Sequence, residues 1–200
     1  PDPLWSRGLG DVYKRQNLDL LLSNIQDLLA EQTVNKIAAD YYHISQWLEQ
    51  NASSNYEFII IDAPASTSPI SINAMLAADL IIVPLECEAL AIKSLKRFLQ
   101  AFKELQKNIE PGLRLAGILL TMYDDEILSH QQVCRQIYQT LGDSVFETII
   151  PNCPYILEAS SMGIDVIQRH LNSEGATGYI RLANELLDRF LLPSSDESIQ

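Results

Sequence analysis

The sequence is poor in the features that hold small secreted proteins together or anchor proteins in membranes. Only 3 of its 200 residues are cysteine, too few for a disulfide scaffold at this length. No apolar run reaches the roughly 18–20 residues of a membrane span, and no segment has the order of a signal peptide. These absences predict a reduced, cytoplasmic protein.

Positive charge is also scarce, with 14 Lys and Arg against 26 Asp and Glu and a net charge of −12. Such a chain repels nucleic acids and anionic membranes on average, so either contact would need a local basic patch. A helix predicted over 91–107 offers one candidate, either a DNA-facing or partner-facing strip or the solvated side of an amphipathic helix; we favour the solvated side. Its basic residues are Lys93, Lys96, Arg97, Lys103 and Lys107.

A loop that could grip nucleotide phosphates is missing from these residues. Neither GxxxxGK(S/T) nor GxGxxG occurs, and none of the six lysines follows a glycine. The 200 residues as written therefore have no cradle for a triphosphate.

The chain nevertheless has the composition of one folded domain, because 47% of its residues are hydrophobic and they come in runs. Residues 1–16 lack periodicity, and their DVYKRQ segment resembles the translation of a sequencing-library adapter. We predict that 1–16 is non-native, that 17–192 is the folded domain and that 193–200 is a disordered acidic tail. A native sequence upstream of Asn17 is then expected.

Continuous apolar runs, several rich in β-branched residues, predict strands at 18–22, 58–61, 80–83, 115–120 and 145–150. Unbroken runs of this kind are typical of strands covered on both faces of a parallel sheet. Helical periodicity predicts two helices between 25 and 48, one that begins at Ser68-Pro69, and two more over 91–107 and 175–192. The alternation predicts a doubly wound α/β fold, with a mostly parallel sheet and helices on both faces.

One strand end carries a residue suited to nucleotide chemistry. Asp62 directly follows the run at 58–61, and ligands of open α/β sheets bind beyond the carboxyl ends of the strands. A nucleotide hydrolase uses such a carboxylate to hold Mg²⁺, directly or through water. The alternative, an Asp that caps the next helix, is common in α/β proteins. The three histidines and three cysteines have no metal-binding spacing.

At residues 56–66 the sequence YEFIIIDAPAS resembles the YDFIIIDCPPS segment of the ParA/Soj/MinD family of deviant P-loop ATPases. The similarity continues in order through IIVPLECEALAIKSL, GILLTMYD, FETIIP and SEGA. Near the start, NLDLLLSNI resembles the family's NLDLLPSNI. The resemblance covers residues 17 to about 187 and is strongest to the ParA partition branch.

The resemblance implies a P-loop NTPase-like fold without its first strand and its KGGVGKT phosphate loop, which in the family precede NLDLL. It implies a parent ATPase that binds ATP and Mg²⁺, dimerises with ATP, is stimulated by a ParB-like protein and segregates a chromosome or plasmid. The expected location is the cytoplasm, at the nucleoid where DNA is bound. The truncated chain itself is expected to be inactive.

Carried over residue by residue, the resemblance places Asp62 in the second switch, as the catalytic carboxylate beside Mg²⁺ and the attacking water. It places Thr121 and Met122 beside the nucleotide base, together with Pro151 and Asn152 of the following loop. Phosphoryl transfer depends on positioning and electrostatics, so these roles need no covalent chemistry from the protein.

Several positions depart from the family pattern. Asn152 and Tyr155 stand where relatives often have two arginines, and Tyr138 stands where many have another. Those basic residues serve non-specific DNA binding in relatives, so the departures put that activity in doubt. The end of the chain is acidic and lacks a basic amphipathic helix, which argues against membrane binding.

Two other functional classes stay open at this point. The chain could be a non-catalytic interaction module with a ParA-like fold that works through partner contacts. It could also belong to a MinD-like or other regulator, or to a carboxylate-activating synthetase, of the same superfamily.

Overall fold

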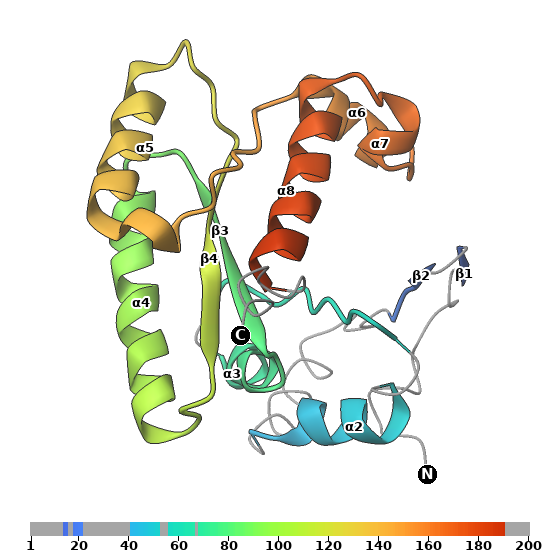
Figure 1. The fold of residues 1–200 in the computed structure, drawn as a ribbon, viewed down its shortest axis with the longest axis vertical. Coiled ribbons are helices and arrows are strands. Elements are labelled where there is room, and N and C mark those ends of the chain that lie inside the picture. The colour runs from blue at the N-terminus through green and yellow to red at the C-terminus, as the bar shows by residue number, and fades with distance from the viewer. Residues whose placement is uncertain (1–13, 16–17, 22–40, 53–55, 67, 191–200) are drawn as a thin grey trace, which may run out of the picture. The chain divides into compact units, whose positions relative to one another are not determined.

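The computed structural model of the chain describes residues 14–15, 18–21, 41–52, 56–66 and 68–190 (Figure 1). The chain divides into two compact units, residues 1–79 and 80–200, and each is described by itself.

The second unit is built on a parallel sheet. Strand β3 (Leu80–Glu86) pairs in parallel with β4 (Arg114–Thr121), and helix α4 (Ala91–Asn108) connects them. A third extended segment runs beside the other edge of β4, with parallel bridges from Ile118 to Val145 and from Tyr123 to Pro151. The predicted strands at 80–83 and 115–120 are confirmed, and the one predicted at 145–150 pairs only near its ends.

Helices cover both faces of this sheet (Figure 1). Ile118 and Leu120 of β4 pack with α4 and α5 (Leu128–Leu141), whereas Ala116 and Leu119 pack with α8 (Glu174–Phe190). A β-bulge lies between Ile81 and Ile82 of β3 and shifts the register of β3 with β4. This shift turns Ala116 toward α8. The predicted doubly wound α/β architecture is confirmed for this unit.

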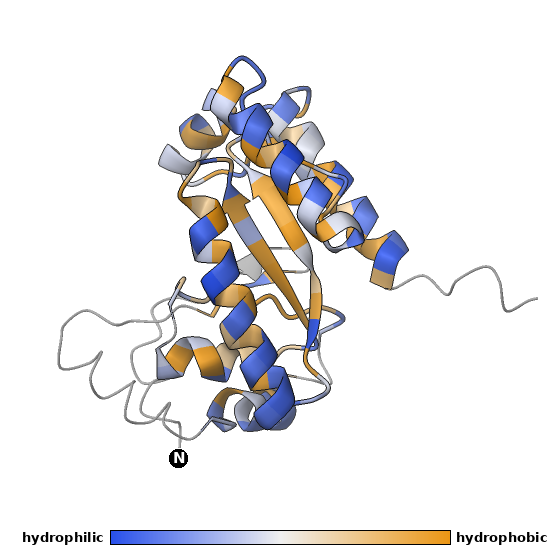
Figure 2. Cartoon of the chain, turned by 90° about the vertical axis from the view of Figure 1, so that its left-hand side faces the viewer, coloured by the Kyte–Doolittle hydropathy of each residue, from blue (hydrophilic) through white to orange (hydrophobic). Residues whose placement is uncertain are grey.

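The helices form where the sequence gives them an apolar stripe. Helix α4 buries Leu95 and Phe102 and leaves its basic residues exposed, as its pattern predicts. In Figure 2 the strands are mostly hydrophobic and the helices in front of them carry hydrophilic residues on their outer sides. Helix α8 confirms the helix predicted over 175–192 as far as Phe190, and residues 191–192 lie outside the described residues.

Short elements connect α5 to α8. A 3-10 turn, η2 (Gly142–Ser144), leads into the extended segment, which is followed by α6 (Pro154–Ser161) and α7 (Val166–Arg169). The Asp165 carboxylate caps α7 by accepting from the Gln168 N–H at 2.8 Å.

The first unit contains a two-stranded ribbon and two helices. Strand β1 (Lys14–Arg15) pairs antiparallel with β2 (Leu18–Asp19), and α2 (His43–Asn51) contacts α3 (Pro69–Leu76). The Ile44 N–H donates to the fully buried Asn73 Oδ1 at 2.8 Å, which joins the two helices. Ser68 is the N-cap of α3 and Pro69 stands in its first turn, as predicted.

Two strand predictions in this unit are wrong or too long. The strand predicted at 18–22 is only Leu18–Asp19, and its partner is an antiparallel ribbon strand rather than the parallel sheet. Residues 58–61 form no strand and are largely exposed, with Ile60 94% exposed. A strand exists only where a neighbour satisfies its N–H and C=O groups, and among the described residues none pairs with this run.

Other predictions fall outside the described residues. These are the helix predicted around 25–29, the start of the next helix at Ile37, most of the segment 1–16 and the tail 193–200. Among the described residues, no helix combines the length and apolar character that crossing a bilayer would require.

Candidate nucleotide-base site

Four of the five residues predicted for the site come together at the carboxyl end of β4. Backbone hydrogen bonds tie this corner on both sides: the Cys87 N–H donates to the Thr121 carbonyl at 3.2 Å, and the Asn152 N–H donates to the Tyr123 carbonyl at 2.7 Å. The Tyr123 N–H in turn donates to the Ile150 carbonyl at 3.2 Å. Thr121 and Met122 therefore lie beside the loop that carries Pro151 and Asn152.

Met122 has an unusual backbone conformation at this corner. Its φ is 53°, in the left-handed region, and it is the one non-glycine with positive φ among the described residues. Its side chain is 48% exposed although the preceding residues of β4 are buried. A non-glycine residue in this region costs free energy, and such strain gathers at functional sites. The strained turn directs the chain out of the sheet at the predicted base contact.

The turn that follows β4 is held by local bonds. The Asp124 N–H donates to His130 Nδ1 at 3.2 Å, and the Asp124 carboxylate accepts from the Glu126 N–H at 2.9 Å. Gln131 Nε2 donates to the Asp125 carbonyl at 2.6 Å. This carboxyl-rich segment is a polar turn that fixes the position of the strand end.

On the other side of the corner, α6 and α8 pack directly against the loop. A Cβ added at Gly175 would lie 2.7 Å from Ile156 Cγ1, and one added at Gly178 would lie 3.3 Å from Pro151 Cδ. A side chain at Gly175 would clash with Ile156, so glycine there lets α8 pack this closely on α6. A side chain at Gly178 would crowd Pro151, which would have to shift by a few tenths of an ångström.

The positions at which relatives often have basic residues hold uncharged side chains in this chain. The Tyr155 ring contacts the His170 ring in a tilted arrangement, with ring centroids 4.4 Å apart, and Asn152 is exposed. The Tyr138 hydroxyl donates to the Phe146 carbonyl at 2.7 Å, and burial raises the pKa of Tyr138 to about 12. Tyr138 is therefore a neutral hydrogen-bond donor within the fold.

Cys87, which lies directly after β3, has no nucleophilic character. It is fully buried, and burial, with Cys134 nearby, raises the pKa of the Cys87 thiol to about 11. The thiol is protonated at neutral pH, when only a thiolate would react. Cys87 acts as a small apolar core residue.

Asp62 belongs to the unit of residues 1–79 and is described within that unit alone. Its side chain is exposed, and no hydrogen bond or ion pair joins its carboxylate to another described residue. The turn after it is ordered by hydroxyls: Ser71 Oγ donates to the Pro64 carbonyl at 3.0 Å, and Ser66 Oγ lies 2.9 Å from Ser71 Oγ. The Asp62 carboxylate is thus available to a ligand, and hydrogen bonds hold the turn that follows it to α3.

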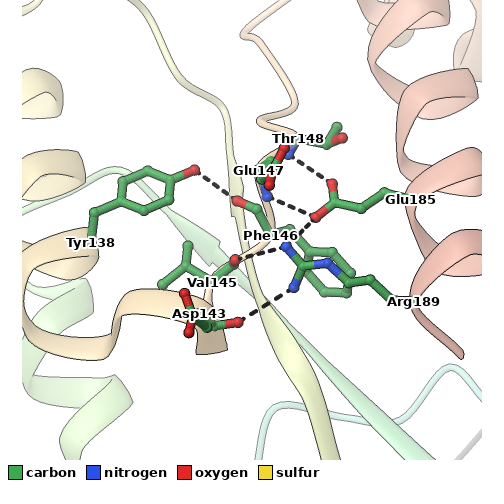
Figure 3. A network of polar contacts seen from close by, with 8 residues as sticks. All are labelled: Tyr138, Asp143, Val145, Phe146, Glu147, Thr148, Glu185 and Arg189. Atoms are coloured by element: carbon green, nitrogen blue, oxygen red, sulfur yellow. Dashed lines mark hydrogen bonds and ion pairs between the residues drawn. The ribbon is translucent and has the colours of Figure 1, made fainter. Parts of the chain in front are cut away.

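A polar network around Glu185 and Arg189 escaped the sequence analysis (Figure 3). The Glu185 carboxylate accepts from the Glu147 and Thr148 N–H groups, both at 2.8 Å, and forms an ion pair of 2.6 Å with Arg189. Arg189 donates to the carbonyls of Asp143 and Val145 and lies over the Phe146 ring. The spacing of Glu185 and Arg189 indicates only a helix surface pair; their backbone partners 37 to 46 residues away are invisible in the sequence.

The electrostatics of Glu185 follow from these bonds. Burial alone would raise the pKa of Glu185, but hydrogen bonds from Thr148 and Glu147 and the charge of Arg189 outweigh it and lower that pKa below its ordinary value. The carboxylate is ionised at neutral pH and holds the extended segment from its outer side.

Comparisons with known proteins identify the fold. In the solved cobyrinic acid a,c-diamide synthase of Mycobacterium smegmatis with bound ATP analog and magnesium, 62% of the chain matches 85% of this one, at 28% identity and a TM-score of 0.68. The fold thus defines an α/β protein of the P-loop ATPase class. A family model described as an AAA domain matches residues 9–115.

Two curated relatives identify the family to which the chain belongs. The chromosome-partitioning ATPase Soj of Thermus thermophilus is 40% identical over 134 residues, which are 67% of this chain and 54% of that protein. The sporulation initiation inhibitor protein Soj of Bacillus subtilis is 33% identical over 171 residues, 86% of this chain and 67% of that protein. The chain belongs to the ParA/Soj/MinD family of AAA-domain proteins. It spans about half to two thirds of the length of these relatives.

Proposed function

We propose that this chain is part of a ParA-type ATPase that binds ATP and Mg²⁺, hydrolyses ATP and partitions a chromosome or plasmid. The observation that carries the proposal is the corner at the end of β4, where the strained Met122 and the Pro151 loop meet as the family resemblance implies. The identity to chromosome-partitioning Soj, 40% over 134 residues, supports the same assignment.

The base of the nucleotide binds at this corner. Thr121 and Met122 contact it from the strand end, and Pro151 and Asn152 contact it from the loop. The exposed Met122 and Asn152 offer an apolar surface and an amide that can both donate and accept, which suits a purine base.

Asp62 is the proposed magnesium carboxylate. Mg²⁺ keeps several waters and is bound by one or two carboxylates together with substrate phosphates, so a lone exposed carboxylate is a suitable donor. Asp62 would hold Mg²⁺, directly or through water, and position the attacking water, and the metal would supply neutralisation of the phosphate charge.

The phosphate grip is supplied by sequence other than these 200 residues, because they contain no glycine–lysine loop. We expect no saturable binding of Mg-ATP to the isolated chain by isothermal titration calorimetry. A saturating signal that Asp62→Ala abolishes would overturn this expectation and place the grip within the chain.

The decisive experiment uses the gene. A GK(S/T) loop in frame upstream of Asn17, with Mg-dependent ATP hydrolysis by the protein that carries it, would support the proposal. Asp62→Ala should abolish that hydrolysis, whereas Asp79→Asn, which removes another exposed carboxylate, should leave it unchanged. A stop codon close upstream, or hydrolysis unaffected by Asp62→Ala, would refute the ATPase role.

The partners follow from the same assignment. The protein forms an ATP-dependent homodimer, is stimulated by a ParB-like protein and acts in the cytoplasm without binding membranes. Non-specific DNA binding through the Pro151 loop and the start of α6 is disfavoured, since Asn152 and Tyr155 stand there where relatives often have basic residues. A ParB-like gene next to this one would support the partner assignment.

One observation favours a second candidate, a non-catalytic ParA-like module that works through protein contacts. It is the absence from these residues of any lysine that follows a glycine. The same gene sequence separates the two candidates, because only the ATPase needs a GK(S/T) loop.

A further inference from the structure

The loop that carries Pro151 and Asn152 depends on a segment with little sheet pairing of its own. Residues 145–151 form two isolated bridges, Val145 with Ile118 of β4 and Pro151 with Tyr123 just after β4, instead of a continuous ladder. On the β4 side, the Phe146 N–H donates to the Ile118 carbonyl at 3.0 Å and the Ile150 N–H donates to the Leu120 carbonyl at 2.9 Å. Between these two anchors, the N–H groups of Glu147 and Thr148 point away from the sheet.

Side chains of α8 form hydrogen bonds with the backbone groups that point away from the sheet. Glu185 accepts both N–H groups, and Arg189 donates to the carbonyls of Asp143 and Val145 just before them. From the opposite side, the Tyr138 hydroxyl of α5 donates to the Phe146 carbonyl. Figure 3 shows the segment held between Tyr138 and the Glu185–Arg189 pair. The paired side chains are well shielded, with 13% of the Glu185 side chain and 25% of the Arg189 side chain exposed.

The same helix also contacts the loop that follows. The backbone of Gly178, two turns before Glu185 on α8, approaches Ile150 and Pro151. Helix α8 is therefore fixed to the chain before the loop by hydrogen bonds and to the loop itself by close packing. A shift of the segment at 147–148 is transmitted within three residues to Ile150, whose carbonyl accepts from Tyr123 beside Met122.

We propose that Glu185, supported by Arg189, is a positioning residue for the nucleotide-base loop: it holds the backbone at 147–148 so that Pro151 and Asn152 lie beside Met122. The assignment of the loop to the base rests on the proposed function, whereas the positioning itself does not. Glu185 touches no reacting atom and acts through the backbone.

The first test measures hydrogen–deuterium exchange by mass spectrometry, resolved to short peptides, in the whole chain. Glu185→Gln keeps the shape of the side chain but leaves one oxygen acceptor where the carboxylate has two. We expect exchange over 150–153 to rise about tenfold, the order expected for one lost hydrogen bond to a charged group. Exchange in α5 over 133–137 should not change.

The matched control is Asp188→Asn, which removes one negative charge from an exposed position three residues along α8. It should leave exchange over 150–153 unchanged. An equal rise at 133–137 in Glu185→Gln would mean that Glu185 serves global stability alone, and no rise at 150–153 would mean that it does not hold the loop. Either result overturns the proposal.

A second variant covers the case in which Glu185→Gln fails to fold. Arg189→Lys keeps the charge beside Glu185 but lacks the planar fork that spans two carbonyls. We expect faster exchange over 143–148 and a smaller rise over 150–153. Unchanged exchange at both segments would contradict the role given to the pair.

The last test links the loop to its ligand and uses adenosine as the probe, since the chain lacks a phosphate grip. Adenosine at about millimolar concentration, where the base alone binds too weakly for a saturable calorimetric signal, should partly slow exchange over 121–123 and 150–153 in the wild type, and Glu185→Gln should reduce this protection. Equal protection in the two proteins would overturn the positioning role. If adenosine protects neither segment, the base site of the proposed function fails, while the exchange of the free protein still decides the role of Glu185.

Discussion

Two runs of apolar residues, at 58–61 and 115–120, have similar composition and opposite surroundings. In the second run Ile118 and Leu120 are fully buried, β3 pairs with one edge of the strand, and residues 145–151 meet the other. In the first run Ile60 is 94% exposed, and no described residue pairs with the backbone. The difference shows that an apolar run becomes a strand through its neighbours, because backbone groups must find partners before they can be buried.

The largest expected effect comes from removing a buried side chain of the paired run. Leu120→Ala should lower the free energy of unfolding by about 2–5 kcal/mol, because it leaves a cavity between β4 and the α4–α5 layer. Ile60→Ala should change it by less than about 0.5 kcal/mol, because that side chain is already in water. Urea denaturation followed by circular dichroism measures both. Equal losses would show that residues 58–61 are as well packed as β4.

A second prediction tests how closely the loop end of this unit is packed. Gly175→Ala should destabilise the protein by about 1–3 kcal/mol, since its Cβ would lie 2.7 Å from Ile156 and α6 would have to move away from α8. Gly178→Ala, with its nearest contacts at 3.3 Å, should cost less. Thermal melting of the two variants compares them, and a larger loss at Gly178 would mean that α8 and α6 are not in close contact.

The third prediction concerns the pH dependence of the network that supports the third extended segment. The lowered pKa of Glu185 means that its stabilisation is fully present above the unfolded pKa of about 4.3 and is lost as pH falls through the lower folded value. At pH 7 Glu185→Gln should be less stable than the wild type by about 1–2 kcal/mol. The difference should shrink as the pH falls below about 4.

The measurement for Glu185 is denaturant unfolding of both proteins across this pH range. Asp188→Asn serves as the control, with no pH-dependent difference expected. A wild-type advantage that stayed constant down to pH 3 would show that ionisation of Glu185 does not contribute.

A charge introduced into the unpaired run at 58–61 should change stability the least. It should, however, change association clearly. Exposed apolar segments and open strand edges promote association, and a lysine opposes it. Ile60→Lys should raise the monomer fraction in size-exclusion chromatography and alter the unfolding free energy by less than about 0.5 kcal/mol. A loss of more than about 2 kcal/mol would mean that residues 58–61 are packed as a strand after all.

Much of the second unit follows from local sequence patterns. The amphipathic stripes of α4 and α8 and the unbroken runs of β3 and β4 identify these elements because each pattern fits one backbone period. The bulge that turns Ala116 toward α8 could not be predicted, since it depends on the register between two strands. The left-handed conformation of Met122 carries no local signal in the sequence either.

The candidate site was predictable in a different way. Thr121, Met122, Pro151 and Asn152 were named from family resemblance, and the structure gathers them at one corner because parallel strands end at the same edge of a sheet. Glu185 and Arg189 were missed because their partners are backbone groups, which carry no mark in the sequence. The role of Asp62 stays a prediction, as do the domain bounds.

The sequence by itself determined which segments favour helix or strand, which apolar run a carboxylate follows, and that no glycine–lysine phosphate loop lies within the chain. These properties depend on residue type and on spacing along one stretch of chain. Only the tertiary structure decided which apolar run is paired, where the chain turns at Met122 and how α8 holds residues 143–151. Those outcomes depend on hydrogen bonds and contacts between distant residues, which exist only once the backbone has come together.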